Sequence, residues 1–160
     1  METKTYTTLD RAALGWLSGP WDGEPDKIQW PDEATGLPCL AVRHPYLGHW
    51  CGYVGVAAGH PMHGKGYEDV DIDAHGGLTF AEPCSPGSTE GHGVCHIPAP
   101  GEPEHVWWFG FDCAHSGDYS PQEARRAIAL GYRFKIRPHQ KYRTLRYVQQ
   151  QCAALAAQLK

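Results

Sequence analysis

Short stretches of the chain alternate apolar residues with polar or small ones, a pattern that predicts β-strands. The most apolar stretch covers residues 106–114 and reads Val-Trp-Trp-Phe-Gly-Phe-Asp-Cys-Ala. Such a run is typical of a strand inside a sheet rather than at its edge. Residues 44–48 join two further predicted strands and have a length suited to a hairpin. The predicted strands are residues 27–30, 37–43, 49–56, 69–75, 78–80, 106–114 and 132–137.

Three other stretches carry apolar residues at helical spacing. The first is residues 8–17, which Gly19-Pro20 follows. The second begins at Ser120-Pro-Gln-Glu123, a capping box with proline at the first helical position, and ends before Gly131. The third begins near Thr144 and carries an apolar stripe formed by Leu145, Val148, Cys152, Leu155 and Leu159. This stripe predicts a helix that packs on a sheet, and a two-helix seam in a homodimer is the alternative.

Together these elements predict a single compact α+β domain over residues 1–160. We expect a mostly antiparallel sheet with a short N-terminal helix and two C-terminal helices. The 19 glycines and 13 prolines favour a fold rich in loops and strands. Residues 81–105 form a long connection for such a domain, so we expect them to be functional or poorly ordered.

The chain has no apolar stretch near the roughly 20 residues that a membrane span needs. Its first residues, Met-Glu-Thr-Lys-Thr-Tyr, lack the apolar core of a signal peptide. We therefore expect a cytoplasmic protein with no membrane partner. In that compartment its six cysteines are expected to be reduced and mostly buried. Cys84 and Cys95 flank a loop with glycine and serine and are the one pair considered for a local disulfide.

Charge is divided unevenly along the chain. Residues 1–120 carry 5 Lys/Arg against 17 Asp/Glu, and residues 121–160 carry 9 against 1. One explanation is that the basic segment packs beside acidic loops. The other is a basic face that attracts a phosphate-bearing ligand, nucleic acid or an acidic protein. Arg133, Lys135 and Arg137 alternate with apolar residues, so we expect them to hold phosphate from one face of a strand.

Ionisable residues gather where the predicted strand 106–114 ends. His115 shares the strand face of Phe111 and Cys113, whereas Asp112 lies on the other face. The two side chains converge only if the chain turns at Ala114, which the following Ser-Gly pair favours. We therefore interpret Asp112 and His115 as candidate catalytic residues. For Asp118 a local turn or capping role is preferred.

A second histidine lies at the end of the predicted strand 69–75. Asp73 and His75 share a face of that strand, so the carboxylate is placed to orient the imidazole. A histidine oriented in this way, near a second histidine, suits general acid–base catalysis on a phosphate ester or a glycosidic bond. The alternative is a pair of exposed polar residues on an edge strand. Thr79 and His60 are further candidates for binding the ligand.

Metal-binding patterns are present only in part. His49-x-Cys51 and Cys113-x-His115 each place two ligand types on one strand face, and His60-x-x-His63 lies in a glycine-rich loop. None of these matches a complete zinc signature. We expect no metal or other cofactor, with zinc as the alternative.

Four segments of the chain resemble a family of small, poorly characterised phage and prophage proteins. They are His49-Trp-Cys-Gly-Tyr-Val54, Gly59-His-Pro61, His75-Gly-Gly-Leu-Thr79 and Trp108-Phe-Gly-Phe-Asp-Cys-Ala-His115. They span the middle half of the chain, whereas the first 35 residues and residues 81–105 fall outside. The resemblance implies a phage accessory protein in the cytoplasm of an infected bacterial host. It also implies a role in evading host immunity, and it supplies no catalytic residues.

These observations lead to two hypotheses of function. The first is a hydrolase in which His75 and His115 act as acid and base, Asp73 and Asp112 orient them, and basic side chains hold a nucleotide or nucleotide signal. The second is a protein without catalysis that sequesters such a signal or inhibits a host defence protein by binding. A zinc-stabilised structural domain is a third reading, ranked below both.

Overall fold

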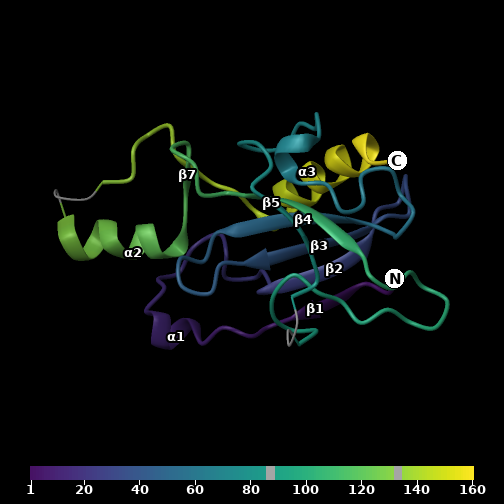
Figure 1. Cartoon of the computed structure of the whole chain (residues 1–160). Coiled ribbons are helices and arrows are strands. Elements are labelled where there is room, and N and C mark those ends of the chain that lie inside the picture. Colours follow the sequence, from purple (N-terminus) through teal and green to yellow (C-terminus); the bar gives the residue numbers. More distant parts are fainter. Residues whose placement is uncertain (86–88, 132–134) are drawn as a thin grey trace.

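Six strands form one antiparallel sheet in the computed structural model of the chain (Figure 1). The structure describes residues 1–85, 89–131 and 135–160. The strands follow the order β1-β2-β3-β4-β6-β5 across the sheet. Their bounds are Lys4–Tyr6 (β1), Lys27–Pro31 (β2), Pro38–Arg43 (β3), Trp50–Val56 (β4), Phe80–Pro83 (β5) and Trp107–Asp112 (β6). The predicted α+β fold with an antiparallel sheet is confirmed.

The apolar strand β6 lies inside the sheet, as predicted, with β4 on one side and β5 on the other. Its residues alternate between the two faces, so that Phe109 and Phe111 join one buried cluster and Trp108 joins another. The predicted hairpin between β3 and β4 is also present. Its turn closes with a hydrogen bond from the backbone N–H of Gly48 to the carbonyl of His44, and Gly48 takes a φ of +83° that favours glycine.

The helix α3 (Leu145–Gln158) covers one face of the sheet (Figure 1). Thr144 caps its first turn. In its apolar stripe Val148, Cys152, Leu155 and Leu159 are buried, and Leu145 is half-buried. The sheet therefore occupies the surface that a two-helix dimer seam would need. No helix in the described part of the chain has the length and apolar character needed to cross a bilayer.

The two other helices lie outside this layer. The short helix α1 (Arg11–Leu14) begins at its cap Asp10 and stops at Gly15, whose φ of +69° breaks the helical path, so it is shorter than the predicted 8–17. The helix α2 (Pro121–Leu130) has the predicted capping box at Ser120 and projects away from the sheet (Figure 1). A small parallel ribbon of β7 (Asp118–Tyr119) and β8 (Lys141–Tyr142) connects α2 to the domain.

Two predicted strands need correction. Residues 69–75 form no strand: the 3₁₀ helix η1 (Tyr67–Asp69) is followed by irregular chain. Val70, Ile72 and Ala74 nevertheless pack on the core, so their alternation reflects one-sided packing without a strand partner. In the predicted strand 132–137, residues 132–134 lie outside the described residues and 135–137 are not in a strand.

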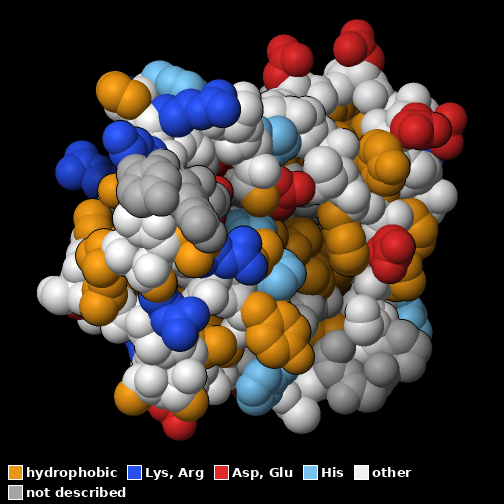
Figure 2. Space-filling view, turned by 90° about the vertical axis from the view of Figure 1, so that its left-hand side faces the viewer, with side chains coloured by type: hydrophobic (Ala, Val, Ile, Leu, Met, Phe, Trp, Pro, Cys, Tyr) orange, Lys and Arg blue, Asp and Glu red, His pale blue; other side chains and the backbone are white. Residues whose placement is uncertain are grey.

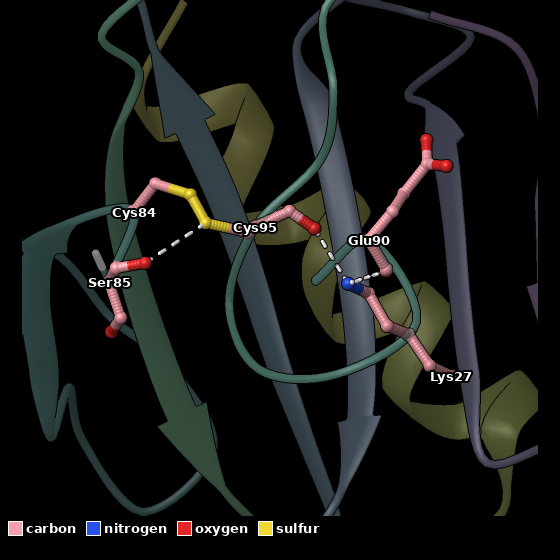
Figure 3. Close-up of a disulfide and its surroundings, with 5 residues drawn as sticks. All are labelled: Lys27, Cys84, Ser85, Glu90 and Cys95. Atoms are coloured by element: carbon pink, nitrogen blue, oxygen red, sulfur yellow. Dashed lines mark hydrogen bonds between the residues drawn. A yellow bond between two sulfur atoms is a disulfide. The ribbon is translucent and has the colours of Figure 1, made fainter. Parts of the chain in front are cut away.

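The face of the sheet opposite α3 is covered by the segment between β5 and β6, and a disulfide joins Cys84 to Cys95 in this segment (Figure 3). The expectation that all six cysteines are reduced is therefore wrong for this pair. The buried side chain of Lys27 donates hydrogen bonds to the carbonyls of Glu90 and Cys95. Burial lowers the pKa of Lys27 to about 8. Among the other cysteines, Cys39, Cys113 and Cys152 are buried free thiols and Cys51 is half-buried.

Candidate functional site

Three segments that lie far apart in the sequence meet beside the first turn of α3. They are the irregular segment that contains His75, the turn that follows β6, and residues 143–147. The turn closes with a hydrogen bond of 2.9 Å from the backbone N–H of Asp118 to the carbonyl of His115. We call the residues that meet here the His75–His115 cluster, and its members are His75, Asp112, His115, Asp118, Arg143 and Tyr147.

Both ring nitrogens of His75 are hydrogen-bonded. Nε2 lies 2.8 Å from Oδ2 of Asp118, and Nδ1 lies 2.7 Å from the hydroxyl oxygen of Tyr147. An ionised carboxylate only accepts, so Nε2 carries the hydrogen and donates the hydrogen bond to Asp118. In the neutral imidazole, Nδ1 then accepts the hydrogen bond from the hydroxyl of Tyr147. His75 is thereby fixed in one orientation and one tautomer.

Asp118 is the buried centre of the cluster, with 1% of its side chain exposed. Its Oδ1 accepts a hydrogen bond of 2.6 Å from Nε of Arg143, and its Oδ2 accepts one of 3.1 Å from the backbone N–H of His115 in addition to the bond from His75. Burial raises the pKa of Asp118, but the hydrogen bonds from His75 and Arg143 outweigh it, so the pKa lies below its ordinary value. Asp118 is therefore ionised at neutral pH.

His115 is the more open of the two histidines, with 34% of its side chain exposed against 12% for His75. Its Nδ1 lies 3.4 Å from Oδ2 of Asp118 and 3.8 Å from Oδ1 of Asp112. This nitrogen is inaccessible to solvent, and it has no hydrogen-bond partner among the described residues. The His75 and His115 rings meet edge to face with centroids 5.4 Å apart.

Two more of the predicted residues join this region. Oγ1 of Thr79 donates a hydrogen bond of 3.2 Å to Oδ2 of Asp112, and the backbone N–H of Ala114 donates one of 3.1 Å to Oδ1. The chain does turn after β6, as the convergence of Asp112 and His115 required. The structure therefore brings together His75, His115, Asp112 and Thr79.

Asp73 and His60 are not brought to the cluster. Asp73 is exposed, and its backbone N–H and carbonyl are hydrogen-bonded to the side chain of Gln158 near the end of α3. The carboxylate that orients His75 is that of Asp118, because the predicted strand that was to align Asp73 with His75 is absent. Nε2 of His60 lies 2.7 Å from the carbonyl oxygen of Leu159. This contact is twelve residues along α3 from Tyr147, or about 18 Å at the helical rise.

The predicted phosphate-binding residues lie on the segment between α2 and α3. Lys135 and Arg137 are exposed, and Arg133 lies outside the described residues. The backbone N–H of Arg137 donates a hydrogen bond to Oε1 of Gln140, whose Nε2 donates one to the carbonyl of Asp118. On the face shown in Figure 2, Lys and Arg side chains lie mainly on one side and Asp and Glu mainly on the other, and some of the His side chains lie between them.

Sequence reasoning missed three members of the cluster. Asp118 was interpreted as a turn residue, which is correct for its bond to the backbone of His115 but incomplete. Arg143 and Tyr147 carried no local signal, because only the docking of α3 places them beside Asp118 and His75. The guanidinium of Arg143 also lies 4.9 Å from the centroid of the Tyr147 ring, which further fixes both side chains.

The metal-ligand pairs predicted from the sequence are not the ones that assemble. Among the described residues, the one group of three or more His, Cys, Asp or Glu side chains placed to share a metal ion is His75, His115 and Asp118, with donor atoms within 4.8 Å of one another. His49 is instead stacked on His44, and burial lowers its pKa to about 4. Burial also raises the pKa of the Cys113 thiol, which disfavours the thiolate that zinc requires.

A cavity of about 330 Å³ lies elsewhere, under residues 91–94 on the sheet face opposite α3, with Lys27 and Tyr53 in its wall. Its lining includes no member of the His75–His115 cluster. The charged groups in its wall include Asp26 and Arg43, which form an ion pair with each other. Asp26 also pairs with Arg11, and Arg43 also pairs with Glu24. We therefore place the candidate site at the cluster, where ionisable groups converge and one histidine is partly open to solvent.

Comparison of the chain with protein-family models, with curated proteins and with solved structures finds no match.

Proposed function

We propose that the chain is a hydrolase that cleaves a phosphate ester in a small phosphate-bearing molecule, and that the His75–His115 cluster is its active centre. The observation that supports this most is that the buried, ionised Asp118 lies between two histidines. His75 is held by hydrogen bonds at both ring nitrogens, and His115 is partly exposed. Paired histidines held by a carboxylate are suited to proton transfer near neutral pH.

In this proposal His115 is the group that exchanges a proton with the reacting water. Its Nδ1 faces the carboxylates of Asp118 and Asp112, which favour a proton on that nitrogen. A neutral ring with the proton on Nδ1 leaves Nε2 as the acceptor, and one third of this side chain is exposed to solvent. His75, with both nitrogens engaged, acts as a positioning residue: it holds Asp118 in place.

Phosphate binding is assigned to the basic C-terminal quarter of the chain. Arg143 reaches the cluster itself, and Lys135, Arg137 and Lys141 are exposed on the neighbouring segment. The excess of 9 Lys/Arg over 1 Asp/Glu in residues 121–160 attracts an anionic ligand toward this end of an otherwise acidic chain. A nucleotide or a nucleotide-derived signal fits this charge. The resemblance to phage proteins adds a context, in which the substrate is a signal of host defence.

A second candidate function is sequestration of the same ligand without turnover. It is favoured by one observation, namely that both ring nitrogens of His75 are already hydrogen-bonded. A site built only to bind gains from such rigidity and needs no group free to transfer a proton.

The two candidates are separated by incubating the protein with nucleoside mono-, di- and triphosphates and with cyclic mono- and dinucleotides, followed by chromatography of the products. Multiple turnovers of one of these compounds support the hydrolase. Stoichiometric retention of an intact compound, seen by native mass spectrometry, supports sequestration. If the protein neither cleaves nor retains any compound of the panel, the assignment of a nucleotide ligand is wrong.

A further inference from the structure

Three side chains of the His75–His115 cluster direct donor atoms toward a common point. Nε2 of His75 and Nδ1 of His115 lie 2.8 Å and 3.4 Å from the same oxygen, Oδ2 of Asp118. Ligands of a tetrahedral zinc ion at bond lengths of about 2.0–2.1 Å are roughly 3.3 Å apart. The His115–Asp118 pair already has this separation, and the His75–Asp118 pair reaches it if it opens by about 0.5 Å.

The hydrogen bonds around these donors are those that support metal ligands in proteins. Nδ1 of His75 is 2.7 Å from the hydroxyl of Tyr147. An ion that takes the place of the Nε2 proton moves that proton to Nδ1, and Nδ1 then donates to the Tyr147 hydroxyl oxygen while the Nε2 lone pair binds the ion. Arg143 donates a hydrogen bond to Oδ1 of Asp118, and the backbone N–H of His115 donates one to Oδ2, which keeps a further lone pair that faces the two histidines. Each of the two ligands thus has an outer partner that fixes its orientation without occupying its donor atom.

His115 supplies an independent observation. Its Nδ1 is shielded from solvent yet lacks a hydrogen-bond partner among the described residues, which is costly for a polar atom unless something else satisfies it. The His115 ring also rests directly on the backbone of Gly76, where a Cβ would overlap the ring atoms. The close approach of the two chain segments holds the ring with Nδ1 toward Asp118.

We propose that His75, His115 and Asp118 bind one divalent transition-metal ion, and we name zinc, which proteins bind through two imidazoles and one carboxylate. Three protein ligands leave a fourth position open, as in catalytic rather than structural zinc centres. The inference deepens the proposed function: it rests on that function for what the ion does, but not for its binding. With the ion present, His115 keeps its place beside the reacting water and serves as a ligand instead of a base.

The test uses the full chain, stripped of metal with a chelator and then titrated with Zn²⁺ alone and with Co²⁺ alone. We expect one ion per chain by elemental analysis after removal of the excess, and a Co²⁺ visible spectrum typical of a four-coordinate site. His115→Gln and Asp118→Asn should each weaken binding at least tenfold, and Tyr147→Phe about tenfold, since loss of an outer partner typically costs 10–100-fold. His60→Gln together with His63→Gln is the control and should leave the affinity unchanged.

A glycine pair provides a matched control for folding. Gly76 and Gly77 both have positive φ values, of +69° and +89°, but only a Cβ at Gly76 meets His115. Gly76→Ala should therefore weaken metal binding, whereas Gly77→Ala carries the same kind of backbone strain and should retain it. Circular dichroism confirms that each variant is folded before it is titrated.

The inference is overturned if the folded wild-type chain retains no ion, or if retention survives the substitutions of His115 and Asp118. Retention that disappears in the His60/His63 variant would overturn it as well, because the ion would then sit in the glycine-rich loop. Failure of the proposed function looks different. An ion bound at the cluster without cleavage of any phosphate ester contradicts the function alone. Cleavage by the metal-free protein contradicts the role of the ion in cleavage and leaves its binding to be decided by the titration.

Discussion

His75 and Asp118 lie 43 residues apart in the sequence, yet Nε2 of the histidine is 2.8 Å from Oδ2 of the aspartate. This contact ties the irregular segment before β5 to the turn after β6. Asp118 also accepts a hydrogen bond from Arg143, the residue before the N-cap of α3, so one buried carboxylate connects three parts of the fold. The same residue is therefore important for both stability and the candidate chemistry.

The first prediction concerns that carboxylate. Asp118→Asn keeps the shape of the side chain but removes the charge that His75 and Arg143 engage. We expect the free energy of unfolding in urea to fall by about 1.5–3 kcal/mol, the typical value of a hydrogen bond to a charged group. Asp73→Asn is the control: this side chain is exposed, so the change should stay within about 0.5 kcal/mol. Equal effects of the two substitutions would contradict the placement of Asp118.

The second prediction concerns the dependence of stability on pH. Burial lowers the pKa of His49 to about 4 from its ordinary 6.5, so the unfolded chain binds a proton there that the folded chain rejects. The stabilisation is complete above pH 6.5 and is lost as the pH falls toward 4. The shift corresponds to about 3 kcal/mol. Denaturant titrations between pH 7 and 4 should show this loss, and His49→Asn should flatten the curve over that window. An unchanged slope in the variant would show that other groups cause the loss.

The third prediction concerns the cysteines. Titration of thiols in the denatured, unreduced protein should find four free groups, because Cys84 and Cys95 are joined. Replacing both with serine should lower the free energy of unfolding by about 2–4 kcal/mol, as expected for a short closed loop. Reductant should destabilise the wild type by a similar amount and leave the double variant unaffected. Six free thiols in the protein as isolated would contradict the pairing.

The fourth prediction concerns the basic segment. Arg137→Glu should raise KM for a phosphate ester about fivefold, since an exposed ion pair contributes up to about 1 kcal/mol, and added salt should reduce the difference. Lys65→Glu makes the same change in net charge at an exposed position in the acidic part of the chain. It should leave KM unchanged. Equal effects would mean that total charge, rather than this segment, attracts the ligand.

Sequence patterns predicted the elements whose signals are local. The capping box at Ser120, the stripe of α3 and the run of β6 each depend on neighbours within a few residues, and each is present as expected. The alternation of apolar and polar residues at 69–75 predicted a strand that is absent. Packing of Val70 and Ile72 on the core produces the same alternation as a paired strand.

The candidate site was predictable only in part, for a related reason. His75 and His115 stand out because each follows apolar residues beside glycines. The residues that make them a cluster are Asp118, Arg143 and Tyr147, and they reach the histidines through the turn after β6 and through the docking of α3. Spacing along the chain does not contain that information, so the carboxylate nearest in sequence, Asp73, was paired with His75 instead.

The most direct measurement compares two histidine variants in one assay of phosphate-ester cleavage. His115→Asn removes the partly exposed histidine of the cluster, and His60→Asn removes a histidine about 18 Å away along α3. We expect His115→Asn to lower kcat at least 100-fold with little change in KM, and His60→Asn to retain the wild-type rate. Equal rates for wild type and His115→Asn would show that the His75–His115 cluster is not the active centre.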